Sequence, residues 1–351
     1  MAERFAIIVH SNARRPDRRI RLPVLNLDWW SRFVSPQASA PIGISSPFGR
    51  AEGWLFFLNY DLAQLRDLPT ARLLKRTIHA GEKASRLGAR IIGLGAPLLQ
   101  ALGSAALAVA RNLDSTVTGG AGCAVAAAID GLWKAAELME IDPEEAAVLI
   151  IGAAEPCGSA CAQILARDGV NYLTLVDTDR ARLDQLARRV LYDCGVACKI
   201  SARAGQAVAQ ADLIIAAGEA AGFALHPALI KSGAVVCNLS AADELTARII
   251  SCRSDVMIFD QSVLRLPGGV VLCHDPALPA DAVRAPMAEA VLLALEGRFD
   301  RYFLGYGLRV EKLIQMRRLS RKHGFTLSGF AALDRYFNFA AVRAIRKGRP
   351  A

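Results

Sequence analysis

The sequence lacks internal repeats and low-complexity runs, and its 53% hydrophobic content excludes a disordered chain. Its N-terminus lacks an apolar stretch long enough for a signal peptide. Its eight cysteines lack the paired spacing of a metal or disulfide framework. A chain of 351 residues can bury a large core and is expected to form two domains. We therefore expect a reduced, cytoplasmic, globular protein.

Two C-x3-C pairs come nearest to a metal motif, Cys157 with Cys161 and Cys194 with Cys198. Neither pair has a histidine or a further cysteine at a matching interval. This favours buried thiols that act as small apolar residues, and we expect no metal site.

The longest apolar run, residues 89–112, approaches the length of a membrane span. Glycine and proline interrupt it at Gly93, Gly95, Pro97 and Gly103. We therefore expect a buried strand or loop there, followed by a helix rich in small residues.

The net charge of +9 is concentrated near the C-terminus. From Arg317 onward the chain has nine lysines and arginines against Asp334 alone, so this segment supplies +8 of the total. Five aromatic residues lie among these charges, at Phe325, Phe330, Tyr336, Phe337 and Phe339. Such a basic, aromatic segment can contact anionic lipid at a membrane, an acidic carrier protein or nucleic acid, although no sequence-specific nucleic-acid partner is expected. The alternative is a solvated helix end.

The order of predicted elements indicates an α/β fold with a Rossmann-like, doubly wound parallel sheet. Residues 1–139 begin with strands and a hairpin and continue in helices, as a mixed α/β domain. Residues 140–265 alternate short β-branched runs with amphipathic helices, the pattern of right-handed βαβ units. Residues 266–325 form a loop and helices that return to complete the N-terminal domain. Residues 326–351 form the basic aromatic tail.

A nucleotide turn is predicted in "VLIIGAAEPCGSA", where a strand runs into Gly152 and a helix follows Gly158. These two glycines, with Ser159 beside them, are the candidates for holding a phosphate. Asp177 ends the next strand at the position of an acid that binds a ribose 2′-OH, which favours NAD(H). Capping the following helix is an equally good role for Asp177.

Two features complicate the choice of nucleotide. Arg180 and Arg182 lie just beyond Asp177, so a 2′-phosphate, as in NADP(H), is also compatible with the sequence. Glu155 stands within the turn, where a carboxylate 4 Å from a phosphate is repelled by roughly 4 kcal/mol at an effective dielectric constant of 20. Binding of NAD(P)H therefore depends on whether Glu155 points away from the phosphates.

Seven stretches of the sequence are distinctive: "ISSPFGRAEGWLFFL", "LLKRTIHAGEKASRLGARIIGLG", "STVTGGAGCAVAAAIDGLWKAAELMEID", "VLIIGAAEPCGSA", "PGGVV", "AEAVLLALEGRFDRYFLGYGLRVEKL" and "SRKHGF". Through these stretches the sequence resembles the long-chain acyl-[acyl-carrier-protein] reductases known from cyanobacteria, over most of the chain up to Phe325. The resemblance implies reduction of a fatty acyl thioester to the aldehyde with NADPH, and acyl carrier protein as a partner. It also implies a nucleophilic cysteine at the start of the helix in "APMAEAVLLALEG".

This chain departs from the family at two functional positions. Pro286 occupies the place of the nucleophilic cysteine, and Glu155 replaces a glycine of the nucleotide turn. The remaining candidates for a nucleophile are Cys273, which has His274 beside it as a base, and Cys123. We carry two hypotheses: a divergent reductase of acyl thioesters or aldehydes, and a catalytically silent homologue that binds an acyl group, a carrier or another partner.

Overall fold

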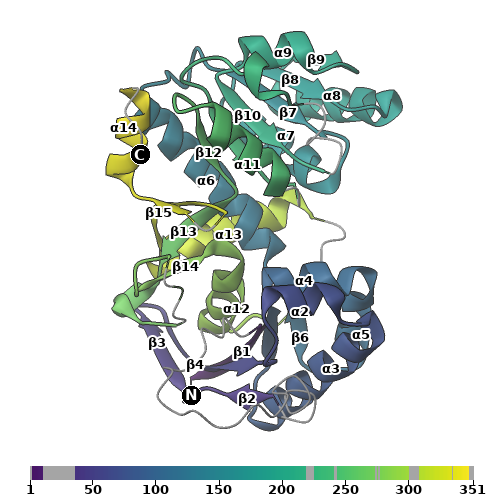
Figure 1. The fold of residues 1–351 in the computed structure, drawn as a ribbon, viewed down its shortest axis with the longest axis vertical. Coiled ribbons are helices and arrows are strands. Elements are labelled where there is room, and N and C mark those ends of the chain that lie inside the picture. The colour runs from purple at the N-terminus through teal and green to yellow at the C-terminus, as the bar shows by residue number, and fades with distance from the viewer. Residues whose placement is uncertain are drawn as a thin grey trace, which may run out of the picture.

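The computed structural model describes residues 2–10, 36–218, 225–240, 243–272, 275, 277–299, 308–333 and 335–347. Three sheets organise these residues, and Figure 1 shows them as a lower N-terminal lobe, an upper Rossmann-like lobe and an antiparallel sheet between the two. The predicted α/β class is confirmed.

The N-terminal sheet has the strand order β2-β4-β1-β5-β6, with β3 paired on β4. β1, β4, β5 and β6 run parallel, while β2 and β3 are antiparallel to β4. The predicted hairpin is the β3–β4 pair. The strands are β1 (Glu3–Val9), β2 (Gln37–Ala38), β3 (Ile42–Ser46), β4 (Gly49–Phe57), β5 (Ile91–Leu94) and β6 (Thr116–Thr118).

Helices cover both faces of this sheet. Successive side chains of a strand point to opposite faces, so those of β1 enter two different cores. Phe5 and Ile7 pack in the core that includes α12 (Ala285–Leu295), whereas Ala6 and Ile8 pack in the core that includes α3 (Thr70–Arg86). α12, from the C-terminal part of the chain, thus packs against the N-terminal sheet.

The apolar run 89–112 folds as predicted, into a buried strand followed by short helices. In the part of the chain that the structure describes, no helix is both long and apolar enough to cross a membrane. These helices are α4 (Ala96–Leu102), the 3₁₀ turn η1 (Gly103–Ala105) and α5 (Ala106–Arg111), while α2 (Leu62–Asp67) lies earlier in the chain, before α3.

The Rossmann-like sheet is fully parallel, with the order β12-β11-β10-β7-β8-β9. Read from β9, this is the 3-2-1-4-5-6 order of the dinucleotide-binding fold, and its order reverses between β7 and β10. The elements are β7 (Ala147–Ile151), α7 (Pro156–Arg167), β8 (Tyr172–Val176), α8 (Arg180–Cys194), β9 (Cys198–Ser201), α9 (Gly205–Gln210), β10 (Leu213–Ala216), η2 (Pro227–Leu229), β11 (Val235–Asn238), α11 (Asp243–Cys252) and β12 (Met257–Phe259).

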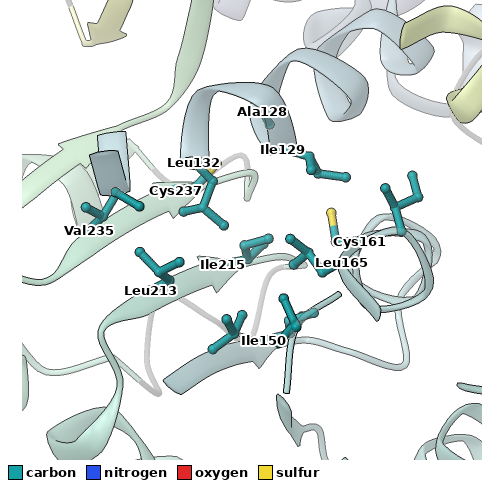
Figure 2. Close-up of a cluster of buried hydrophobic side chains, with 14 of the residues drawn as sticks. Ala128, Ile129, Leu132, Ile150, Cys161, Leu165, Leu213, Ile215, Val235 and Cys237 are labelled. Atoms are coloured by element: carbon teal, nitrogen blue, oxygen red, sulfur yellow. The ribbon is translucent and has the colours of Figure 1, made fainter. Parts of the chain in front are cut away.

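The long helix α6 (Ala121–Met139) joins the two lobes. Its residues Ala128, Ile129 and Leu132 share one buried cluster with strands of the Rossmann-like sheet (Figure 2). Each large aliphatic side chain buried here contributes about 2 kcal/mol, so the helix is firmly held on the sheet. The sequence assigned α6 to the N-terminal domain, but its middle packs on the second lobe. The sheet and α7 residues of this cluster in Figure 2 include Ile150, Cys161, Leu165, Leu213, Ile215, Val235 and Cys237.

The antiparallel sheet changes two sequence-based boundaries. Its strand order is β14-β13-β15-β16, so Gln261–Arg265 (β13) leaves the parallel sheet, which we expected to extend to residue 265. β15 (Thr326–Ala332) pairs with β13, so the C-terminal segment is part of the fold and not an appended tail. The other elements are η3 (Pro267–Gly269), β14 (Ala282–Arg284), α13 (Val310–His323), β16 (Arg335–Phe337) and α14 (Phe339–Arg346).

The aromatic residues of the basic segment belong to the core. Phe325, Phe330 and Phe337 are buried, and Tyr336 donates a hydrogen bond from its hydroxyl to the Ser328 carbonyl at 2.7 Å. Phe330 packs against Phe259 of β12, with ring centroids 4.9 Å apart. Phe325, Phe330 and Phe337 therefore pack inside the fold and do not form part of an exposed aromatic surface. Pairing of β15 with a distant strand is what buries them.

Arg317 of α13 ties the helices of the two lobes together. Its guanidinium donates to Asp130 Oδ1 of α6 at 2.7 Å and to both oxygens of Asp168, at the end of α7, at 2.9 Å. The side chain of Arg317 is only 13% exposed. We expect Arg317→Ala to lower the free energy of unfolding by about 2 kcal/mol, since it breaks the link between two partly buried carboxylates and leaves Asp130 with Arg321 and Asp168 with the Trp133 indole N–H. The exposed neighbour Arg318→Ala should change it by less than about 0.5 kcal/mol in urea denaturation, and equal losses would contradict the bridging role.

Candidate active site

The nucleotide turn is as tight as the sequence predicts. Gly152 follows β7 with φ at +75°, and a Cβ there would lie 1.7 Å from the carbonyl oxygen of Ala217. A Cβ at Gly158 would lie 2.2 Å from the carbonyl oxygen of Gly152. Glycine is therefore required at both positions, the first for the turn and the second for packing of α7 on the strand.

Asp177 lies beside this turn and holds it by hydrogen bonds. Its Oδ2 accepts from the Ala154 N–H at 3.0 Å, and its Oδ1 accepts from the Asp179 N–H at 3.1 Å. Asp179, not Asp177, caps α8, with its Oδ1 accepting from the Arg182 N–H at 3.1 Å. The alternative role that the sequence left open for Asp177 therefore belongs to its neighbour.

Both arginines that could bind a 2′-phosphate already pair with carboxylates of the same segment. Arg180 Nε lies 3.3 Å from Asp184 Oδ2, and Arg182 Nε lies 3.3 Å from Asp179 Oδ2. A 2′-phosphate would have to compete with these carboxylates and would meet Asp177 as well. The negative charge at the end of β8 therefore favours binding of a ribose 2′-hydroxyl there over binding of a 2′-phosphate.

Glu155 is the N-cap residue of α7, and its side chain makes no capping hydrogen bond. It is exposed, and its Cγ lies 2.7 Å from where a Cβ on Gly218 would be. The side chain thus leans over the end of β10, on the side where the sheet order reverses and where such folds bind their ligands. No side chain among the described residues caps the first turn of α7, so the Cys157 and Gly158 N–H groups can serve an anion. Ser159 lies one turn in, its N–H bonded to the Glu155 carbonyl at 2.8 Å.

The position that the resemblance assigns to a nucleophile lies where two helices begin. Pro286 is in the first turn of α12, and a Cβ on Gly120, the N-cap of α6, would lie 2.2 Å from the Pro286 carbonyl oxygen. The two helix starts are in direct backbone contact. Proline is compatible with a first helical turn but offers no nucleophile.

Cys123 of α6 lies in a buried polar cluster that the sequence did not reveal. Its backbone N–H donates to Glu289 Oε2 at 2.7 Å, and the Thr118 hydroxyl donates to Glu289 Oε1. Glu289 of α12 therefore acts as the cap that Gly120 cannot provide for α6. Burial raises the pKa of Glu289, and burial followed by the charge of Glu289 raises the pKa of the Cys123 thiol. A protonated thiol is a poor nucleophile, so this setting works against the candidate role of Cys123.

Glu289→Ala should lower the free energy of unfolding by about 3 kcal/mol, because it leaves buried N–H groups at the start of α6 without an acceptor. Glu289→Gln keeps one acceptor and should retain most of the stability. Since the pKa of Glu289 is raised on folding, the wild type should lose stability as pH rises above about 4.3, the ordinary glutamate value. The glutamine variant should lack that slope in urea denaturation between pH 4 and 7, and a wild-type slope in this variant would exclude Glu289 as its origin.

The remaining candidates are Cys273 with its base His274, and His79, a histidine within a predicted helix that could act as an acid or base. Cys273 and His274 lie outside the described residues. His79 lies on α3, across the N-terminal sheet from α12, and its half-exposed ring is 3.8 Å from Glu82 Oε2. Among the residues with described positions, no group of three or more histidines, cysteines or carboxylates could hold a metal ion. The site brought together is Gly152, Gly158, Ser159 and Asp177, with Glu155 over it.

Comparison with known proteins gives distant similarities. No protein family matches the chain. The chain is 22% identical over 262 residues to the aminotransferase PigE of Serratia sp. (strain ATCC 39006), a match that covers 74% of this chain and 30% of PigE. It therefore spans less than a third of that relative.

Solved structures that match the chain distantly include two dehydrogenases. L-tryptophan dehydrogenase from Nostoc punctiforme is 10% identical, with a TM-score of 0.37 over 99% of this chain and 88% of that one. Quinate dehydrogenase from Corynebacterium glutamicum, in complex with NAD, is 16% identical, with a TM-score of 0.33 over 77% of this chain and 88% of that one. Likeness at this level leaves the function to be argued from this chain's own residues.

Proposed function

We propose that this protein is a nicotinamide-dependent oxidoreductase related to the acyl-[acyl-carrier-protein] reductases, and that it acts on a fatty acyl thioester or aldehyde. The observation that carries the proposal is the turn after β7. Gly152 and Gly158 let the backbone come close to a ligand, the first turn of α7 is uncapped, and Asp177 is fixed at the end of β8. These residues fit a dinucleotide at the point where the sheet order reverses.

The preferred dinucleotide in this proposal is NAD(H). Asp177 supplies an acceptor for a ribose hydroxyl, while Arg180 and Arg182 are engaged by Asp184 and Asp179. The Cys157 and Gly158 N–H groups would face the pyrophosphate. The side chain of Glu155 would have to move away from Gly218 to make room for it. When bound, the nicotinamide supplies the hydride for reduction of a carbonyl carbon.

Thioester reduction also needs a thiolate, and Pro286 and Cys123 do not provide one. Cys273, with His274 as its base, is the proposed nucleophile. Its thiolate would attack the thioester carbonyl and release the carrier thiol, and addition of hydride to the resulting acyl group would release the aldehyde and restore the thiolate. An aldehyde substrate would need no nucleophile.

Cys273→Ala is therefore expected to lower aldehyde formation from an acyl thioester by at least about 1,000-fold, as loss of a nucleophile does in other enzymes. Cys123→Ala is the matched control and should retain near wild-type turnover, because its buried thiol stays protonated. The measurement is NADH oxidation together with detection of the aldehyde. Unchanged turnover in Cys273→Ala would remove this residue from the mechanism.

Acyl carrier protein is the proposed source of the acyl group. Exposed arginines and lysines of α13 and α14, among them Arg318, Arg321, Arg343 and Lys347, can attract an acidic carrier. Burial of Phe325, Phe330 and Phe337 makes a carrier a better partner for this surface than a membrane. Binding should weaken steeply as salt rises.

Glu155 and Pro286 favour a second candidate function, a silent homologue that binds an acyl group or a partner without turnover. Both substitutions affect the same chemistry, one at the nucleotide turn and one at the family's nucleophile position. Nucleotide titration separates the two candidates. Absence of NADH and NADPH binding, together with retained binding of an acyl carrier, would identify the silent homologue.

A further inference from the structure

A serine, a histidine and a glutamate form a linked relay where three elements meet, away from the nucleotide turn. Ser46 ends β3 in the tight turn to β4, Glu296 follows α12, and His323 ends α13. The Ser46 Oγ lies 2.7 Å from His323 Nδ1, and His323 Nε2 lies 2.8 Å from Glu296 Oε2. Both contacts have hydrogen-bond length, so the three side chains form one continuous chain.

The glutamate determines the direction of both hydrogen bonds. The hydrogen bonds from Lys322 and His323 and the charge of Lys322 outweigh burial and lower the pKa of Glu296, so its carboxylate is ionised at neutral pH and can only accept. In a neutral imidazole, Nε2 must then carry the proton and Nδ1 the lone pair. The Ser46 hydroxyl therefore donates to Nδ1, as a serine does to its general base.

The serine is held rigidly at the protein surface. A Cβ on Gly49 would lie 2.1 Å from the Leu295 carbonyl oxygen, so the turn rests directly on the end of α12. The Phe48 N–H points at Ser46 Oγ from 3.3 Å, and the Phe48 ring contacts the His323 ring edge-on at 6.3 Å. His323 is fully buried, Ser46 is partly exposed and Phe48 is 63% exposed. The imidazole is thus held within the fold, and it lies against a serine at the partly exposed edge of the site.

We propose that Ser46, His323 and Glu296 form a hydrolytic site for small acyl esters. Ser46 Oγ attacks the ester carbonyl as its proton passes to His323 Nδ1, and that proton then leaves with the alcohol. Water attacks the acyl-serine with His323 as base, which releases the carboxylic acid and restores the serine. Glu296 holds the imidazole in the required tautomer and stabilises its charged form.

The substrate class follows from the surroundings of the hydroxyl. The exposed Phe48 ring offers an apolar surface beside Ser46, and Lys322 Nζ lies 5.5 Å from the centre of that ring. The Phe48 N–H, which donates to Ser46 Oγ, is the backbone donor proposed to stabilise the oxyanion that forms on attack. A short acyl group can lie on this ring without a deep cavity, which favours short-chain esters.

The test uses the full chain, a fluorophosphonate probe that labels activated serines, and hydrolysis of p-nitrophenyl butyrate. Labelling should map to the peptide that contains Ser46. The Ser46→Ala variant should not be labelled, and its rate of ester hydrolysis should be at least about 100-fold lower than that of the wild type. Ser45→Ala, a change at the exposed adjacent serine, is the matched control and should keep both. Thermal unfolding establishes that each variant is folded.

Glu296→Gln separates a relay from a merely structural contact. It should retain the fold but reduce hydrolysis about 10-fold or more, and it should shift the pH profile, because the amide no longer stabilises the imidazolium. Labelling at another residue, unchanged activity in Ser46→Ala, or no hydrolysis above background in the wild type would each overturn the proposal. None of these results depends on nucleotide binding.

Discussion

Replacing Gly152 with alanine is expected to destabilise the protein by at least about 3 kcal/mol and to remove any nucleotide binding. The added Cβ would lie 1.7 Å from the Ala217 carbonyl oxygen, so β10 would have to move, and a φ of +75° adds strain for a residue with a side chain. The free energy of unfolding of a folded domain is typically only about 5–15 kcal/mol, so such a loss would be a large fraction of the total stability. Urea denaturation followed by circular dichroism measures the change.

Gly169 provides the matched control for Gly152. It also has a positive φ, +99°, but nothing lies within 4 Å of a Cβ built there. Gly169→Ala should therefore cost only the backbone strain, about 1–2 kcal/mol. A similar loss for both variants would show that the contact with β10 is unimportant, and the account of the tight turn would be wrong.

Replacing Glu155 is expected to strengthen NADH binding by about 10- to 100-fold at low salt, since it removes a negative charge from the path of the pyrophosphate. The side chain is exposed, so solvent screening keeps the effect below the full Coulomb energy of a buried pair. Glu155→Gly restores the residue type that the resemblance leads us to expect at this position. Calorimetric titration with NADH measures the change in Kd.

Glu155→Gln shows whether charge or bulk is responsible. It keeps the size of the side chain over Gly218 and removes only the charge, so it should recover most of the gain. The difference between wild type and Glu155→Gln should shrink as salt rises. An unchanged Kd in both variants would mean that the carboxylate already lies clear of the phosphates.

The Rossmann-like half of the fold was predictable because each of its βαβ units is formed by one continuous segment of the sequence. Each βαβ unit has its own hydrophobic periodicity, and the turns at Gly152 and Gly158 are visible in the sequence. The antiparallel sheet was not predictable in the same way. Its central strands, β13 and β15, are far apart in the chain, and the positive charge of the last segment suggested a solvated tail. Pairing partners of distant strands carry no local signal.

The candidate site was predictable in part. Gly152, Gly158 and Asp177 were found from spacing, but the direction of Glu155 depends on its contact with Gly218 at the end of another strand. Glu289 had a signal that was missed, an acid within the apolar run of α12. The sequence gives no signal for the role of His323, because its hydrogen-bond partners come from two other elements.

Calorimetric titration of the purified protein with NADH and with NADPH, after removal of any carried-over nucleotide, shows directly whether the turn after β7 binds a nicotinamide dinucleotide. We expect NADH to bind with a Kd below about 1 mM, the upper end of the usual range for enzyme substrates, and NADPH to bind about 10-fold more weakly, because Asp177 repels a 2′-phosphate. Absence of binding by either nucleotide at millimolar concentration would contradict the oxidoreductase proposal and leave the silent homologue.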